Sequence, residues 1–492
     1  MNLEDIKRIK AGLASAKPAI PAKKGRSLEQ LILDAQSADE KRAKKIPKTA
    51  EEKAKEEYEK ILEAFNKHSE EVIQEQLEVR PWKVHDPNKL WDVEIGEEIE
   101  YFDPTLSYEL TGYRPITETE GLDFDPEPFL KAANFYRQYK RYTDFVPGTF
   151  SHINHWKAEF DKCKNGVTIG KYRLTGEHYY FLNYYRLLSV LGKNKEEVRQ
   201  EDFPGFMAKQ YEYFHYLELA RLTKHDACIF KCRGIGYSEV IASNLSHAYT
   251  FHKASKSIVS AAAQGYVDTT LSKCWQQLDF LNTCTEGGFK RLRMKIDTAM
   301  RKRASRVDKD KNETGWMSEI EGVVTDNPRK LRGSRVYNLY FEESGSFPGL
   351  VDTYIQARAL VDILGYRIGM RVVGGTGGDS GPQLAGLNKI FYHPEQFSVL
   401  PYKHNYSQDG SVQFTGFFVP SYEMWFGDET NPGFDNRGVV YKERAKKHYL
   451  DKWKKIDDPN LLAKDKAEFC FTPEDAFILE GSNRFDQELL VD

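Results

Sequence analysis

A glycine-containing segment at residues 230–238 carries side chains that suit the binding of a phosphate group. The segment reads FKCRGIGYS and lies between a short apolar stretch and a helical pattern. Loops of the form GxxxxGK[ST] use glycines to let the backbone wrap phosphates, a lysine to neutralise them and a hydroxyl to bind magnesium. Gly236 and Ser238 occupy the last glycine and the hydroxyl positions, and Tyr237 stands in place of the lysine.

Two cations within this loop can replace the missing lysine. Lys231 stands at the opening glycine position, from which its ammonium can fold over the same phosphates. Arg233 adds a guanidinium fork suited to a terminal phosphate. The loop alone is a weak indication, because a glycine-rich turn between a strand and a helix is often purely structural. The residues that we expect to contact nucleotide are Lys231, Arg233, Gly234, Ile235, Gly236, Tyr237, Ser238 and Glu239.

A second candidate element is an apolar strand that ends in two adjacent carboxylates. Residues 336–343 read VYNLYFEE. In such a pair the first carboxylate holds a hydrated metal and the second polarises an attacking water. We therefore expect Glu342 and Ser238 to hold Mg²⁺ and Glu343 to act as the general base. The alternative is an exposed strand end that happens to carry two acids.

A third strand pattern, residues 368–378 (IGMRVVGGTGG), ends in glycines around one threonine. In ATP-driven motors a polar residue here senses the γ-phosphate, so we expect Thr376, flanked by Gly375 and Gly377, to couple hydrolysis to movement. The alternative is a flexible turn. Three such strand ends in this order are far more specific than any one of them.

The elements that must position these residues alternate between strands and helices. Strands are predicted at residues 227–230, 257–262, 336–341 and 368–373, with helices at 237–249, 266–281 and 351–364. Strand-like pieces follow (QFSVLP and VQFTGFFVP), and then a basic helix at 440–456. This alternation predicts an α/β fold with a mainly parallel sheet and ligands at the carboxyl ends of its strands.

Composition restricts the class of protein. The 71 Lys and Arg against 74 Asp and Glu give a net charge of −3, which excludes a polycation but allows a local basic channel. The six cysteines form no CxxC pair, which argues against a disulfide scaffold or a structural zinc site. No apolar leader or membrane-length apolar run is seen, so we expect a soluble intracellular protein without membrane contact.

Changes of texture divide the chain into four predicted segments. Residues 1–78 form a charged helical arm, with a helix at 48–76 that is either solvated or orders on a partner. Residues 79–202 form an aromatic-rich lead-in domain, 203–425 the ATPase core, and 426–492 a lid and linker. Two basic segments, 290–311 and 442–455, are candidates for contact with DNA, and each is equally interpretable as a solvated insertion or a lid helix.

With these motifs in view, the chain resembles the large terminase subunit of tailed bacteriophages over about residues 170–485. The lysine-shifted phosphate loop, the acidic pair and the threonine turn follow the order seen in that family, and TPEDAFILEGSNRF resembles the segment that closes its ATPase half. The resemblance implies that Gln210 binds adenine and that Arg332, which precedes Gly333 ahead of the acidic strand, acts on a neighbouring subunit's site. Arg335 is the second choice for that role.

The resemblance also implies the cofactors, the partners and the setting. It indicates a P-loop ATPase of the additional-strand, catalytic-glutamate class that uses ATP and Mg²⁺. The expected partners are double-stranded DNA, the portal protein, the small terminase subunit and further copies of the chain in a ring, in the host cell cytoplasm. The chain departs from the family in having Glu342 for Asp and Tyr237 for Lys. The acids that follow Thr376 do not form the pattern of a nuclease sheet, so we expect no endonuclease activity.

Two other functions stay open on this reasoning. One is a different nucleic-acid-dependent P-loop ATPase, of helicase or transposition type. The other is a phage docking protein with a decayed phosphate loop that hydrolyses nothing.

Overall fold

The fold comes from a computed structural model that describes part of the chain. The described residues are 60, 82–86, 89–92, 97–99, 110–189, 200–325, 331, 333–364, 366–377, 384–427 and 432–477. The chain divides into two units, Met1–Glu78 and Val79–Asp492. The helix predicted at 48–76 lies outside the described residues except for Lys60. The boundaries that we expect near residues 202 and 425 stay predictions.

The second unit is built around a mainly parallel sheet. Within the described residues seven strands form it, in the order β10-β13-β9-β14-β17-β8-β20. Their bounds are β8 (Ala227–Lys231), β9 (Lys256–Ala261), β10 (Arg301–Arg303), β13 (Glu319–Val324), β14 (Asn338–Phe341), β17 (Met370–Thr376) and β20 (Phe417–Val419). Every neighbouring pair is parallel except β10 with β13. The predicted α/β class is confirmed, and β17 lies between the loop-bearing β8 and the acid-bearing β14, as the additional-strand class requires.

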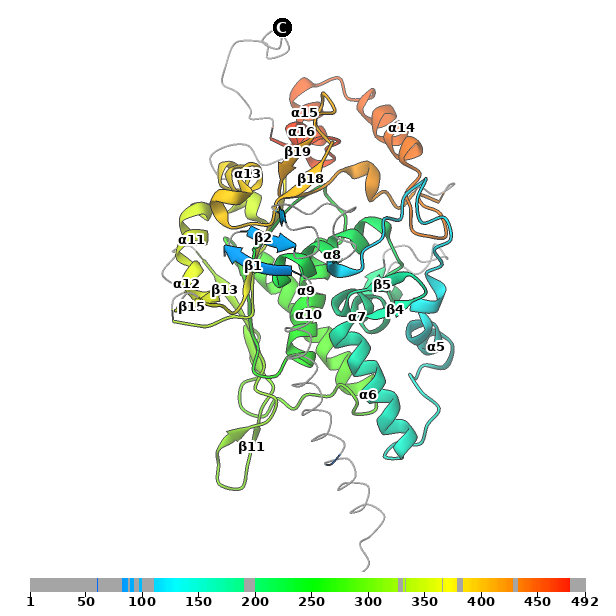
Figure 1. Ribbon diagram of the computed structural model, residues 1–492, viewed down its shortest axis with the longest axis vertical. Coiled ribbons are helices and arrows are strands. Elements are labelled where there is room, and N and C mark those ends of the chain that lie inside the picture. Colours follow the sequence, from blue (N-terminus) through cyan, green and yellow to red (C-terminus); the bar gives the residue numbers. More distant parts are fainter. Residues whose placement is uncertain are drawn as a thin grey trace, which may run out of the picture. The chain divides into compact units, whose positions relative to one another are not determined.

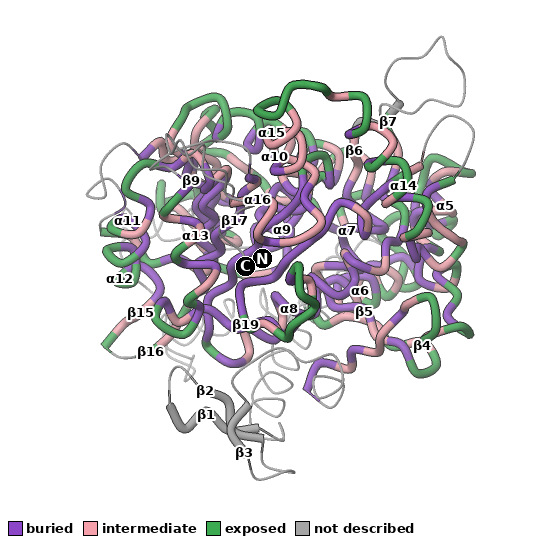
Figure 2. Tube along the Cα trace, turned by 90° about the horizontal axis from the view of Figure 1, so that it is seen from above, coloured by how far each residue is buried: buried purple, intermediate pink, exposed green. Residues whose placement is uncertain are grey.

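Helices cover both faces of this sheet. All residues of β8 and β14 are buried, as expected for parallel strands covered on both sides. A Cβ at Gly374 would meet Tyr237 of α9 (Tyr237–Phe251), and one at Gly375 would meet Leu387 of α13 (Leu384–Tyr392). Consecutive strand residues face opposite sides, so α9 and α13 lie on opposite faces. Strand β17 and helix α9 are purple over most of their lengths in Figure 2, because most of their residues are buried.

The other elements surround the sheet in chain order (Figure 1). Before β8 come β1 (Trp82–Asp86), β2 (Lys89–Asp92), β3 (Glu97–Ile99), η1 (Glu127–Phe129), α5 (Lys131–Tyr139), α6 (Phe150–Asn165), β4 (Val167–Ile169), β5 (Tyr172–Leu174), α7 (Gly176–Tyr184), β6 (Leu187–Ser189), β7 (Gln200–Asp202) and α8 (Ala208–Leu222). Between β8 and β17 lie α10 (Gln264–Cys284), β11 (Arg306–Val307), β12 (Glu313–Thr314), η3 (Ser344–Ser346), α11 (Leu350–Gln356), α12 (Arg358–Val361), β15 (Asp362–Ile363) and β16 (Tyr366–Arg367). After β17 and α13 come η4 (Pro394–Phe397), β18 (Tyr402–His404), β19 (Gln413–Thr415), η5 (Ser421–Glu423), α14 (Lys442–Trp453), α15 (Pro459–Glu468) and α16 (Pro473–Ala476).

Three local predictions are wrong. The helix predicted at 351–364 is two short helices, α11 and α12, followed by the hairpin β15–β16, in which Asp362 pairs with Arg367 and Leu364 has φ 50°. The glycines predicted to begin a turn after residue 373 instead extend β17 to Thr376. The segment QFSVLP forms no strand of the sheet, since η4 ends at Phe397 and only a single bridge joins Val399 to Asp226.

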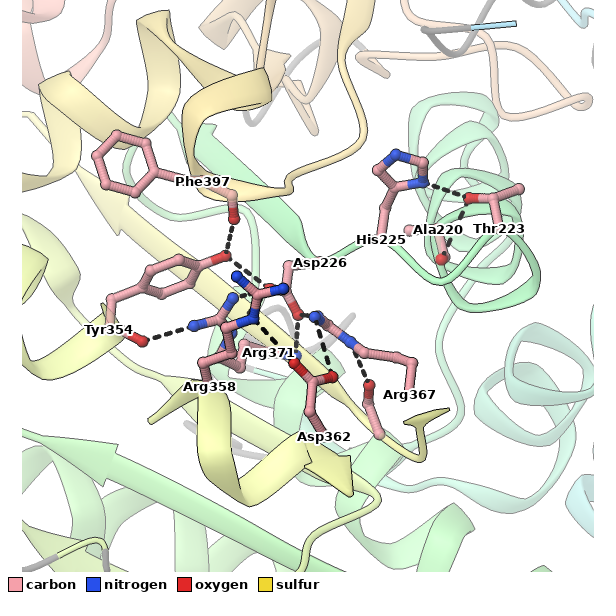
Figure 3. Close-up of polar contacts among 11 residues, drawn as sticks. Ala220, Thr223, His225, Asp226, Tyr354, Arg358, Asp362, Arg367, Arg371 and Phe397 are labelled. Carbon is pink, nitrogen blue, oxygen red and sulfur yellow. Dashed lines mark hydrogen bonds and ion pairs between the residues drawn. The ribbon is translucent and has the colours of Figure 1, made fainter. Parts of the chain in front are cut away.

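A buried ion-pair cluster anchors the amino ends of β8 and β17 (Figure 3). Asp226, directly before β8, is fully buried and accepts hydrogen bonds from the Arg371 backbone N–H and Nε, both at 2.7 Å, and from the Tyr354 hydroxyl at 2.8 Å. Arg367 also pairs with this carboxylate. Burial would raise the pKa of Asp226, but the guanidiniums of Arg371 and Arg367 lower it below its ordinary value. The cluster lies at the edge of the sheet opposite the phosphate loop.

Candidate active site

The carboxyl ends of β8, β17 and β14 bring the three predicted motifs to one edge of the sheet. The parallel registers pair Lys231 with Thr376 and Phe341 with Val373. The acidic pair follows Phe341 directly, so both carboxylates emerge beside the last residues of β17. Long-range strand pairing thus joins residues more than a hundred positions apart in the chain.

Glu343 stands between the lysine and the threonine. Its Oε1 lies 3.5 Å from Lys231 Nζ, and its Oε2 accepts a hydrogen bond from Thr376 Oγ1 at 3.2 Å. The backbone of Glu343 is left-handed, with φ 44° and ψ 50°. A non-glycine residue in this conformation costs on the order of 1–3 kcal/mol and is characteristic of functional sites. The lysine, the expected base and the expected coupling threonine therefore form one contiguous polar group.

The loop between β8 and α9 has the geometry of an anion site. Gly234 has φ 83° and Gly236 has φ 74°, a region that glycine occupies without steric cost. A Cβ at either position would meet no atom within 4 Å, so the outer side of the loop is open. Gly236 caps α9, whose first-turn N–H groups and positive dipole end favour a bound phosphate. Ile235 is buried, so only its backbone is placed to face a ligand.

Tyr237, which replaces the usual lysine, points into the protein and not into the loop. It is 5% exposed, and a Cβ on Gly374 would lie 2.1 Å from its hydroxyl. Lys231 Nζ lies 5.6 Å from the centre of the Tyr237 ring, within cation–π range. The tyrosine thus fills the space above β17 and supports the lysine from below.

Ser238 and Glu342 form the expected metal-binding pair. Glu342 is 2% exposed, and the hydroxyls of Ser238 and Thr270 both hydrogen-bond to its carboxylate. Burial, with Glu343 adding to it, raises the pKa of Glu342 above its ordinary value, whereas the two hydroxyls and the Lys273 ammonium oppose the rise. No group of three or more His, Cys, Asp or Glu side chains within the described residues is placed to hold a metal. One hydroxyl and one carboxylate nevertheless fit Mg²⁺, which keeps several waters and takes further oxygens from phosphates.

Glu239 is committed to neighbouring side chains. Its Oε1 lies 2.9 Å from Lys273 Nζ on α10, and its Oε2 accepts a hydrogen bond from the Tyr185 hydroxyl at 2.5 Å. Thr270 and Lys273 were not among the predicted site residues. A threonine and a lysine three positions apart are common on helices, so the sequence carries no signal for their role.

The loop also contacts the C-terminal helices of the described chain. The Arg233 guanidinium pairs with Glu468 at the end of α15, and the Arg233 backbone N–H donates to the Glu468 carbonyl at 2.8 Å. A Cβ on Gly377 would lie 2.6 Å from the Ala476 carbonyl and 2.9 Å from that of Ala467. Segments expected to form a lid therefore lie directly against the phosphate loop and the threonine turn.

Two predicted site residues are not brought to this group. Gln210 is half-buried on the first turn of α8, and no interaction within the described residues joins its side chain to the loop. Arg332 lies outside the described residues. The alternative, Arg335, donates a hydrogen bond to the Ala359 carbonyl at 2.5 Å.

The basic segment 290–311 is largely tied down within the chain. Acidic partners or aromatic rings hold most of its cations: Arg293 with Asp279, Lys302 with Asp297, Arg301 and Arg303 with Glu319, Lys295 with Glu313, and Arg291 over the Trp316 ring. Arg306, Lys309 and Lys311 lie in the hairpin β11–β12 and are exposed, with no ion pair to another described residue. Figure 1 shows that this hairpin extends away from the sheet.

No protein-family model and no curated protein matches the chain. Among solved structures, it is similar to the large terminase ATPase domain of Thermus phage P74-26, over 51% of this chain and 92% of that one, at 14% identity and TM-score 0.34. It is also similar to the large terminase of bacteriophage HK97 (47% and 43% covered, 9% identity, TM-score 0.33). A further similar structure is the large terminase of a thermophilic bacteriophage (46% and 57% covered, 12% identity, TM-score 0.29). None of the described helices has the length and apolar character needed to cross a membrane.

Proposed function

We propose that this chain is the ATP-hydrolysing motor of a phage DNA-packaging terminase. The observation that carries the ATPase assignment is the convergence of Lys231, Glu343 and Thr376 beside the Ser238–Glu342 pair. The packaging role is supported by the order of these motifs in the sequence and by the family resemblance that they produce.

The residues have distinct roles in hydrolysis. Lys231 and the α9 amino terminus bind the phosphates, and Ser238 and Glu342 hold Mg²⁺, which when bound neutralises charge on the phosphate oxygens. Phosphates compete with Glu343 for the Lys231 ammonium and so free the carboxylate to accept a proton from the attacking water. Thr376, bonded to the same carboxylate, responds when the γ-phosphate leaves. Its strand end lies under the C-terminal helices, which gives it a route to movement.

The same proposal assigns the partners. DNA contact is electrostatic and without base readout, as translocation requires. The exposed cations of hairpin β11–β12 are the described residues best placed for it. The portal protein, the small terminase subunit and other copies of this chain complete the machine in the host cytoplasm.

The test measures phosphate release by the purified chain with ATP, Mg²⁺ and double-stranded DNA. Glu343→Gln removes the base while keeping the shape of the side chain, and we expect turnover to fall at least ~100-fold. Glu395→Gln, at an exposed acid on η4 outside the site, is the matched control and should retain full activity. Equal turnover in Glu343→Gln and wild type would overturn the assignment of the base.

The alternative functions predict other outcomes in the same preparation. A helicase or transposition ATPase would act on forked or strand-transfer substrates without a procapsid. A docking protein with a decayed loop would show no turnover under any condition.

A further inference from the structure

Helix α10 is tied to both sides of the candidate metal site. The two metal-binding residues come from different elements, Ser238 from the first turn of α9 and Glu342 from the end of β14. Thr270 and Lys273 of α10 contact both elements, Thr270 through Glu342 and Lys273 through Glu239. They are three positions apart and so project from one face of the helix.

The burial of these groups makes the contacts specific. Thr270 is fully buried, and its hydroxyl donates to Glu342 Oε2. Glu239 follows Ser238 directly, and the Tyr185 hydroxyl holds its other oxygen at 2.5 Å. Glu239 is therefore fixed from two sides, and Lys273 provides the link to α10.

We infer that Thr270 and Lys273 are positioning residues that set the separation and orientation of Ser238 and Glu342 for a divalent cation. The inference rests on the proposed function. Thr270 fixes one carboxylate oxygen and leaves the other directed at the cation, and Lys273 holds the first turn of α9 at a constant distance from β14. Residues that orient metal ligands in this way typically contribute ~10–100-fold to metal affinity.

The experiment measures Mn²⁺ binding to the full chain by electron paramagnetic resonance, with a saturating non-hydrolysable ATP analogue and no turnover. Thr270→Val keeps the shape and removes the hydroxyl, and we expect the Mn²⁺ dissociation constant to rise ~10–100-fold. Thr270→Ser restores the donor and should lie within about threefold of wild type. Thr269→Val is the matched control, because Thr269 is exposed on the same helix and its hydroxyl donates to the Gly265 carbonyl.

Lys273→Met provides an independent second variant at a partly exposed position. It should weaken Mn²⁺ binding in the same direction even if Thr270→Val fails to fold. Wild-type affinity in a folded Thr270→Val protein, or in Lys273→Met, would overturn the inference while leaving the proposed function intact. Failure of wild type to bind the Mn²⁺–analogue pair would instead overturn the proposed function itself.

Discussion

At the scale of single residues, the phosphate loop shows how a charge can move without being lost. The lysine of the usual pattern is replaced by Tyr237, whose side chain is buried against Gly374. Lys231 supplies an ammonium from the end of β8, 3.5 Å from Glu343. The ring of Tyr237 supports this ammonium, so the two substitutions compensate each other.

The first prediction follows from that division of roles. Lys231→Ala should abolish ATP hydrolysis, because one lost charge-assisted phosphate contact costs about 1.5–3 kcal/mol in binding and more in the transition state. Tyr237→Phe keeps the ring that fills the space and should leave turnover within a few-fold of wild type. Phosphate release at saturating ATP measures both, and full turnover in Lys231→Ala would disprove the role of the lysine.

Residue types and spacing revealed the loop, the acidic pair and the threonine, but not their supporting residues. Glycines, paired acids and cations at strand ends have few structural uses, so their pattern is informative. Thr270, Lys273 and Glu468 sit on helices where such residues are common, and only the packing of those helices against the site gives them a role. Sequence pattern also could not show that Tyr237 turns inward.

At the scale of elements, alternating apolar stretches predicted the strands and helices of the core. The order of strands in the sheet depends on long-range pairing and became visible only in the structure. The glycines of residues 374–377 were predicted as a turn because glycine is common in turns. They are instead required where Tyr237, the Gly345 backbone and the C-terminal helices approach β17.

The second prediction tests that close packing between β17 and α9. Gly374→Ala places a methyl 2.1–2.5 Å from Tyr237 ring and hydroxyl atoms, so it should destabilise the fold by about 1–3 kcal/mol. The double variant Gly374→Ala/Tyr237→Ala removes the clash, so its loss should be smaller than the sum of the two single losses. Chemical unfolding of all four proteins measures this coupling, and strict additivity would contradict it.

The third prediction concerns the cluster at the opposite edge of the sheet. Asp226→Asn leaves the buried Arg371 guanidinium without its counter-charge, and we expect a loss of about 3–5 kcal/mol near neutral pH. Because the pKa of Asp226 is lowered in the folded chain, its contribution is fully present above its unfolded value of about 3.9 and declines below that pH. The stability difference between wild type and variant should therefore shrink in acid.

Chemical unfolding at a series of pH values from neutral to about 3 measures this effect. Asp362→Asn is the control, because Asp362 lies at the more exposed margin of the same cluster, where Arg358 and Arg367 contact it. A pH-independent difference for Asp226→Asn would show that the carboxylate does not titrate as the geometry requires.

At the scale of the whole molecule, the site has a base, a loop cation and a metal pair within one chain, and the proposal adds an arginine from a neighbour. Ring ATPases commonly gain about 10³–10⁵ in rate from such a group. Arg332 is our first choice, since it precedes the acidic strand in the sequence, and Arg335 is the second. A single isolated chain should then hydrolyse ATP slowly.

The last prediction separates action in trans from action within one chain. Arg332→Ala and Glu343→Gln should each be inactive alone, because one lacks the arginine and the other lacks the base. In an equal mixture under assembling conditions, a site has its own base with a chance of about one half and a neighbour's arginine with the same chance, so about one quarter of wild-type activity should return. The matched control mixes Arg332→Ala with the double variant Arg332→Ala/Glu343→Gln, which forms no complete site and should stay inactive. Lack of recovery at every mixing ratio would contradict an arginine acting in trans, and recovery with Arg335→Ala in place of Arg332→Ala would assign the role to Arg335.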